Sequence, residues 1–223
     1  MADMFFAAVH RVVPPVAKAI WRPTVTGLEH VPRSGAVILA SNHLSFIDST
    51  MIHVVVPRKV VFLAKSDYFN GTGVKGALIR AWFEGLGMLP VDRDDNKAAL
   101  ASLDTALEVL GRGEAFGIYP EGTRSRDGRL YRGRTGVAHL ALSAGAPIVP
   151  VGLRGTQDLQ PVGARLPRLA PVSVAFGRPI SPTGYDGVPP GRARRELTDR
   201  VMAAISELSG QEAAGVYNER PEV

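Results

Sequence analysis

Short apolar runs alternate with helical patterns along most of the chain, and this alternation is the strongest constraint on its fold. Runs typical of buried strands lie at 37–40, 60–64, 87–91, 115–119, 148–153 and 171–176. Patterns with helical spacing of apolar residues lie at 48–55, 75–84, 96–110, 136–143 and 192–208. Strands that alternate with helices favour an α/β fold, in which helices flank a mostly parallel central sheet.

The chain has 223 residues, which is enough for one sizeable domain. We expect an N-terminal amphipathic segment over 1–22, a single domain over 23–210 and a frayed, polar tail over 211–223. Residues 155–168 are rich in proline and arginine, and we expect a surface loop there. No run of about 18 apolar residues predicts a membrane-spanning helix, and the first residues lack the basic start of a secretory signal.

The N-terminal segment spaces its apolar residues as a helix does, with basic residues among them. These apolar residues are Phe5, Phe6, Val9, Val12, Val13, Val16, Ile20 and Trp21. Such a segment can lie on anionic lipid as an interfacial anchor, or it can pack on the domain's own core. Pro14 and Pro15 should divide it into two short pieces.

Composition excludes several classes of site. Because the chain has no cysteine, it has no disulfides, no thiol nucleophile and no thiolate zinc site. The formal net charge of +5 suits anionic lipid, phosphorylated substrates or nucleic acid. No basic patch interleaved with aromatic residues supports nucleic acid.

The pattern G-x-G-x-x-G at 71–76 stands six residues beyond a strand, whereas a dinucleotide fingerprint follows its strand directly.

His43 and Asp48 form the most informative pattern, because a histidine just after a buried strand is followed by an aspartate where a helix begins. A neutral imidazole can accept a proton from a hydroxyl, and a carboxylate on its other nitrogen fixes the tautomer. Two alternatives stay open here, and a third, a metal site, is discounted. Ser45 and Asp48 can be a capping box, His43 can be a structural histidine, and the pair can suggest a metal site, although no third ligand is near.

Two further stretches follow predicted strands. In 118–126, Gly122 allows close backbone approach, Thr123 offers a hydroxyl and Arg124 a bidentate fork, which together favour a phosphate cradle. Arg93 follows the strand at 87–91 and could reach the same cleft. Solvated surface arginines are the alternative in both cases. The stretch 146–151 is a strand entered through proline.

These stretches, in this order, resemble the 1-acylglycerol-3-phosphate acyltransferase family of glycerolipid acyltransferases. Residues 42–48 resemble the family motif N-H-x-S-x-x-D, 87–93 its second motif, 119–124 the motif with core E-G-T-R, and 146–150 the fourth. The resemblance implies that His43 is the general base and Asp48 its orienting partner, with Asn42 and Ser45 in support. It further implies a set of phosphate-binding residues, namely Lys65, Arg93, Glu121, Gly122, Thr123 and Arg124. Arg134 stands where relatives tend to have lysine.

The resemblance also implies an activity. A fatty acyl group would pass from acyl-CoA or acyl-carrier protein to lysophosphatidic acid, giving phosphatidic acid without a metal or other cofactor. The implied location is the cytoplasmic face of the cell membrane, with peripheral or monotopic attachment. Two alternatives remain: an acyltransferase for another lysophospholipid or a glycolipid, and a lipid-binding relative without catalysis. The second would be expected to lose His43 or Asp48.

Overall fold

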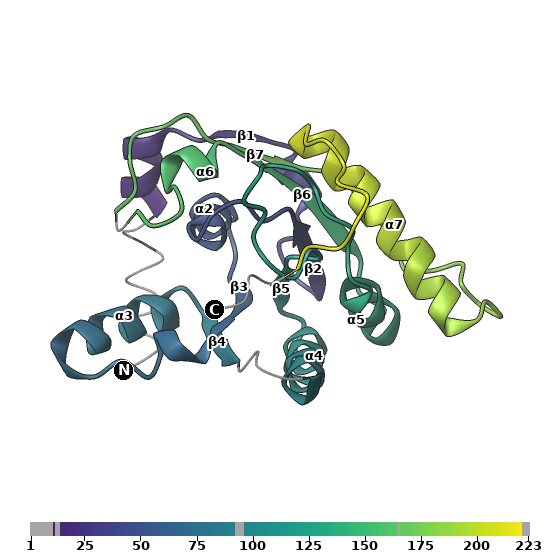
Figure 1. Ribbon diagram of the computed structural model, residues 1–223. Helices are drawn as coiled ribbons and strands as arrows, with labels where there is room; N and C mark the ends of the chain where they lie inside the picture. The colour runs from purple at the N-terminus through teal and green to yellow at the C-terminus, as the bar shows by residue number, and fades with distance from the viewer. Residues whose placement is uncertain (1–10, 12–13, 92–95, 165, 220–223) are drawn as a thin grey trace.

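A seven-stranded sheet forms the centre of the part of the chain that the computed structural model describes, residues 11, 14–91, 96–164 and 166–219 (Figure 1). The strand order is β1-β7-β6-β2-β5-β3-β4. The strands are β1 (Thr24–Thr26), β2 (Val37–Ser41), β3 (Val60–Lys65), β4 (Met88–Val91), β5 (Ala115–Ile118), β6 (Ile148–Arg154) and β7 (Ser173–Phe176).

Helices cover both faces of this sheet. They are α2 (Asp48–Val55), α3 (Gly73–Gly85), α4 (Asn96–Gly111), α5 (Gly136–Ala144), α6 (Thr156–Leu159), α7 (Pro190–Ser209) and the short 3-10 helices η1 (Leu28–His30) and η2 (Ser66–Tyr68). Helix α2 lies on one face, and α4, α5 and α7 lie on the other, while α3 extends outward beyond the β4 edge (Figure 1). The α/β class and the single sheet agree with the sequence prediction.

Strand direction confirms that the sheet is mostly parallel. Strands β6, β2, β5, β3 and β4 run the same way, whereas β7 pairs antiparallel with β6 and parallel with β1. Strand β1 was not predicted, because three residues are too short to show a periodic pattern.

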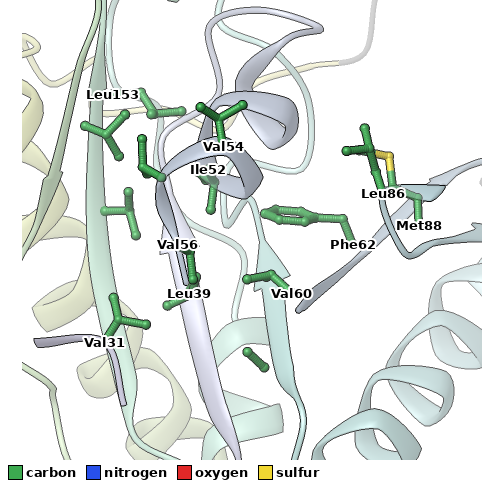
Figure 2. Packing of buried hydrophobic residues seen from close by; sticks show 14 of the residues in the cluster. Val31, Leu39, Ile52, Val54, Val56, Val60, Phe62, Leu86, Met88 and Leu153 are labelled. Atoms are coloured by element: carbon green, nitrogen blue, oxygen red, sulfur yellow. The ribbon is translucent and has the colours of Figure 1, made fainter. Parts of the chain in front are cut away.

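The central strands are buried on both faces, which explains their unbroken apolar runs. All five residues of β2 are buried. Figure 2 shows the layer between α2 and the sheet, where Ile52 and Val54 of the helix lie over Leu39, Val60 and Phe62. A second apolar cluster joins the opposite face to α4, α5 and α7.

Two predictions about the chain's periphery are corrected by the structure. The tail is not frayed over 211–219, because its backbone is hydrogen-bonded to residues 130 and 132. Residues 155–168 are not wholly a surface loop, because α6 lies within them and Leu159 is fully buried.

Where it is described, the N-terminal segment packs on the domain's core through one side chain and leaves other apolar side chains exposed. Residues 14–21 are helical, and Pro14 and Pro15 belong to that helix. Ala17 is buried in the core cluster, whereas Val16 and Ile20 are half exposed. Phe5, Phe6, Val9, Val12 and Val13 lie outside the described residues. No helix in the described ranges is both long and apolar enough to cross a bilayer.

We predict that Gly117→Ala in β5 destabilises the fold. A Cβ at this position would lie 2.1 Å from Cζ of Phe62, in the centre of the core. Overpacking of this kind costs about 1–3 kcal/mol, so urea denaturation should show a lower free energy of unfolding.

The matched control is Gly111→Ala at the end of α4, where an added Cβ would have no neighbour within 4 Å. This variant should be as stable as the parent or slightly more so. Equal stability of the two variants would contradict the packing assigned to Phe62.

Candidate active site

The carboxyl ends of β2 and β5 place two of the predicted motifs side by side. The two strands are parallel neighbours, and Ala40 pairs with Ile118 near the end of each. The segments 42–48 and 119–126 therefore leave the sheet together at its carboxyl edge. Ligands bind at this edge in open α/β sheets.

His43 and Asp48 form a hydrogen-bonded pair at this edge. The Nδ1 atom of His43 lies 2.7 Å from Oδ2 of Asp48, whose side chain is fully buried. The same oxygen accepts hydrogen bonds from the backbone N–H groups of Leu44 at 2.7 Å and Ser45 at 2.9 Å. Because Oδ2 only accepts, Nδ1 must carry a proton, and the neutral ring then has its lone pair on Nε2.

The capping-box interpretation of Ser45 is wrong. Helix α2 has Ile47 as its N-cap and no side-chain cap. The hydroxyl of Ser45 instead donates to the carbonyl oxygen of Gln160 at 2.7 Å, which ties the site loop to the end of α6. The carboxylate of Asp48 accordingly accepts hydrogen bonds from the loop before the helix and from the ring of His43.

The segment after β5 holds the backbone of His43 from both sides. The N–H of His43 donates to Oε1 of Glu121 at 2.9 Å, and its carbonyl oxygen accepts the N–H of Ser125 at 2.8 Å. The other carboxylate oxygen of Glu121 accepts the N–H of Tyr131 at 2.9 Å. The E-G-T-R segment therefore positions the histidine as well as lining the cleft.

This geometry corrects the phosphate-binding role predicted for Glu121. Its side chain is fully buried and both oxygens face backbone N–H groups, so it does not face the cleft. The pKa of Glu121 is raised to about 7, chiefly by burial. The nearby carboxylates of Asp48 and Asp127 contribute to this rise, and the hydrogen bonds from the two backbone N–H groups oppose it.

Tyr119 orients the imidazole plane. Its ring stacks on that of His43 with centroids 3.9 Å apart and planes inclined by 10°. Its hydroxyl lies 2.7 Å from Oγ of Ser49 on α2. Together with Asp48, this contact leaves the ring of His43 little freedom to rotate.

Asn42 continues the pairing of β2 with β6 beyond the end of the strand. Its side-chain amide donates to the carbonyl oxygen of Leu153 at 2.9 Å and accepts the N–H of Leu153 at 2.8 Å. The fully buried amide thus fixes the chain directly before His43, which explains its supporting role.

His43 lies where two cavities meet, and Tyr119 and Leu63 also line both. One, the apolar cavity, has a volume of about 230 Å³ and runs toward α4 and α5. Its apolar lining comprises Phe62, Leu63, Val91, Leu103, Ala106, Phe116, Ile118 and Leu140.

The other, the polar cavity, has a volume of about 200 Å³. Its lining includes the predicted phosphate-binding residues Lys65, Thr123 and Arg124, together with aromatic residues near α3. Lys65 is half exposed and forms an ion pair with Asp67. Gly122 lines the apolar cavity instead, with φ of 81°. Arg93 lies outside the described residues.

A metal centre finds no support in the described ranges, where no cluster of three His, Asp or Glu side chains could hold an ion.

Sequence reasoning missed several residues of the site. Tyr119 belongs to the motif at 119–124, but a single sequence does not indicate that its ring packs on another side chain of the site. Ser125 acts through its backbone N–H, which carries no sequence signal. The contacts from 211–218, described below, were hidden by their polar composition.

The arrangement can perform general base catalysis on a hydroxyl. It offers an oriented imidazole, an apolar space on one side and cationic side chains on the other. The hydroxyl of Ser45 is committed to Gln160, so it is poorly placed as a nucleophile.

Comparisons with known proteins agree with this geometry. The family model described as "Acyltransferase" matches residues 22–154. A chloroplastic 1-acyl-sn-glycerol-3-phosphate acyltransferase of Arabidopsis thaliana is 32% identical over 147 residues, which cover 65% of this chain and 39% of that protein. The chain thus spans about two fifths of the length of this relative.

Two further matches cover a larger share of both aligned chains. A 1-acyl-sn-glycerol-3-phosphate acyltransferase of Bacillus subtilis (strain 168) is 25% identical over 185 residues, 82% of this chain and 86% of that protein. The crystal structure of the 1-acyl-sn-glycerophosphate acyltransferase PlsC from Thermotoga maritima has a TM-score of 0.68 and 25% identity. It covers 91% of this chain and 79% of that one.

We predict a pH dependence of stability that depends on Glu121. Its pKa is raised from 4.5 to about 7 in the folded protein, so between these values the folded state binds more protons than the unfolded state. Stability that is present below pH 4.5 is then lost as the pH rises through about 7. The loss should amount to about 3 kcal/mol at most.

Urea denaturation at pH 5 and pH 8 measures this loss. Glu121→Gln cannot ionise, so its stability should lack this component of the pH dependence. Glu108→Gln, an exposed change on α4, should keep the slope of the parent. Parallel pH profiles for Glu121→Gln and the parent would exclude the assigned cause.

Proposed function

This chain belongs to the acyltransferase family, and we propose that it transfers a fatty acyl group from a thioester to the free hydroxyl of lysophosphatidic acid, which gives phosphatidic acid. The donor would be acyl-CoA or acyl-carrier protein. The curated relatives named above carry this activity in their names, and the family model spans the catalytic pair and the E-G-T-R segment.

The position of His43 between the two cavities is the observation behind this proposal. An acyl transfer needs space for an apolar chain and for a charged acceptor, with the base where the two meet. The apolar cavity suits the acyl chain. Arg124, Lys65 and Thr123 in the polar cavity suit the phosphate of the acceptor, because arginine and lysine are the usual phosphate partners in proteins.

The proposed reaction proceeds directly, without an acyl-enzyme. Nε2 of His43 accepts the proton of the acceptor hydroxyl while the oxygen attacks the thioester carbonyl carbon. Asp48 stabilises the resulting imidazolium. When the tetrahedral intermediate collapses, the carbon–sulfur bond breaks and the leaving thiolate takes the proton from His43. Written this way, the chemistry requires neither a metal nor a redox cofactor.

We also propose that one face of the protein contacts the membrane. Most large apolar side chains that are exposed lie on the N-terminal helix, residue 46, α3 and the 162–169 segment. They are Val16, Ile20, Phe46, Val74, Leu78, Ile79, Trp82, Val162, Leu166 and Leu169. These elements lie on the left side of Figure 1, away from α7.

The members of this apolar face adjoin one another. Ile20 and Leu169 line one surface depression, and Phe46 lines another together with Gly163 and Arg124. Trp82 and Phe46 also line the polar cavity, so the mouth of the site opens on this face. A lysophospholipid could therefore enter from the bilayer. Attachment would be peripheral or monotopic, on the cytoplasmic face, where thioester donors are available.

We predict that the purified protein releases free thiol from acyl-CoA or acyl-carrier protein in the presence of lysophosphatidic acid, with phosphatidic acid as product. His43→Ala should lower turnover by at least about 10²–10⁴-fold, because the general base is lost. Acceptor binding should be nearly unchanged, since the cationic residues of the polar cavity remain.

A matched control is His139→Ala on α5, which lines neither cavity. It should behave like the parent. Thiol release with another lysophospholipid or a glycolipid but not with lysophosphatidic acid would reassign the acceptor. Near-parental turnover of His43→Ala would remove His43 from the mechanism.

We predict that Leu78→Glu on α3 weakens binding to vesicles that contain anionic lipid. Leu78 is 67% exposed, so the change should not disturb the fold, but a carboxylate would meet the headgroup region. Vesicle co-sedimentation should show a loss of about tenfold or more in the bound fraction at limiting lipid.

Ala203→Glu supplies the control, because this exposed position on α7 lies on the opposite side of the molecule. It should bind vesicles as the parent does. If Leu78→Glu and Ala203→Glu reduce binding equally, α3 is not part of the membrane face.

A further inference from the structure

Residues 211–218 return from the end of α7 to the site and pair with the segment after the E-G-T-R motif. The N–H of Leu130 donates to the carbonyl oxygen of Glu212 at 2.8 Å, and Leu130 accepts the N–H of Ala214 at 2.8 Å. Further along, the N–H of Arg132 donates to the carbonyl oxygen of Val216 at 2.9 Å. Figure 1 shows this segment in yellow, running back from α7 toward β5.

The start of this segment supports the residue before the catalytic histidine. Oε1 of Gln211 accepts a hydrogen bond from Nδ2 of Asn42 at 2.7 Å. Its amide nitrogen donates to the carbonyl oxygen of Gly128 at 2.8 Å. Gln211 therefore bridges the loop after β2 and the loop after β5.

The end of the segment contacts two arginines of the site. Nδ2 of the buried Asn218 donates to the carbonyl oxygen of Arg124 at 3.2 Å. Its own carbonyl oxygen accepts Nη2 of Arg134 at 3.3 Å. Arg124 lines the polar cavity and Arg134 the apolar cavity, so Asn218 joins one residue from each.

Tyr217 and Gly122 also contact the side chain of Arg134. The guanidinium carbon of Arg134 lies 5.8 Å from the ring centroid of Tyr217. Its side chain passes so close to Gly122 that an added Cβ there would lie 3.0 Å from Nε. The tail and the glycine thus hold the side chain of Arg134 against the apolar cavity that it lines.

From these contacts we propose that residues 211–218 are a strap that completes the active site, with Asn218 as a positioning residue for the loop that carries Arg124. This inference rests on the proposed function, in which Arg124 binds the phosphate of the acceptor. Asn218 acts through the backbone of Arg124, whereas its contact with Arg134 uses its own backbone oxygen. The side chain of Asn218 should therefore affect binding of the acceptor and not binding of the donor.

A strap of this kind predicts a selective kinetic effect. Without the hydrogen bond to Arg124, the loop must be ordered when the acceptor binds, and this ordering weakens acceptor binding. A segment that served only the fold would alter thermal stability and leave the two Michaelis constants unchanged relative to each other.

We predict that Asn218→Ala raises the KM for lysophosphatidic acid about tenfold, as expected for one lost hydrogen bond. The KM for the thioester donor should stay within about twofold, because the backbone contact with Arg134 persists. Asn218→Asp, which is isosteric but cannot donate, should behave like the alanine variant. Glu207→Gln, an exposed change on α7 outside the strap, should match the parent.

A second measurement makes the strap testable without turnover. Amide hydrogen exchange of residues 122–126 should be faster in Asn218→Ala than in the parent. If the parent releases no thiol with lysophosphatidic acid, the proposed acceptor is wrong. The hydrogen-exchange measurement alone then tests whether Asn218 positions the loop that carries Arg124. Unchanged exchange, or an unchanged acceptor KM in an active enzyme, would overturn the role of Asn218.

Discussion

The parallel pairing of β2 with β5 is the constraint on which the site depends. Because the two strands end level with each other, hydrogen bonds can join the chain after β2 to the chain after β5. Both polar groups of the His43 backbone are used in this way, by Glu121 and by Ser125. The imidazole ring of His43 is then oriented by Asp48 and Tyr119 on a backbone that is already fixed.

Two buried carboxylates support this arrangement at an energetic cost. Asp48 is compensated by one imidazole and two backbone N–H groups, all on a single oxygen. Glu121 has two backbone N–H groups and no cationic partner in the part of the chain that the structure describes, and burial therefore raises its pKa. A buried carboxylate is kept where its loss would leave backbone donors unsatisfied. Here those donors belong to the loops that form the cleft.

The sequence alone predicted the α/β class and most elements, because unbroken apolar runs and helical periods are local signals. It also predicted that His43, Asp48, Thr123 and Arg124 lie together at the carboxyl edge of the sheet, because the ends of parallel strands meet there. It misjudged the role of Glu121, and it left a capping box open for Ser45. A polar side chain beside a cleft can turn inward, and only neighbours distant in sequence decide this. Gln160 captures the hydroxyl of Ser45 from 115 residues away. The tail was expected to fray because it is attached by backbone atoms and by the polar side chains of Gln211 and Asn218, which give no apolar pattern.

The attachment of 211–218 bears on the order in which this protein matures. Ribosomes make the chain from its N-terminus, and domains begin to fold during synthesis. Both motifs of the catalytic edge and every strand of the sheet precede α7. A nascent chain can thus assemble the His43–Asp48 pair while Arg124 still lacks its contact with Asn218. Under the proposed role of the strap, efficient capture of the acceptor begins only after residues 211–218 have also left the exit tunnel, when every strand of the sheet has already been translated.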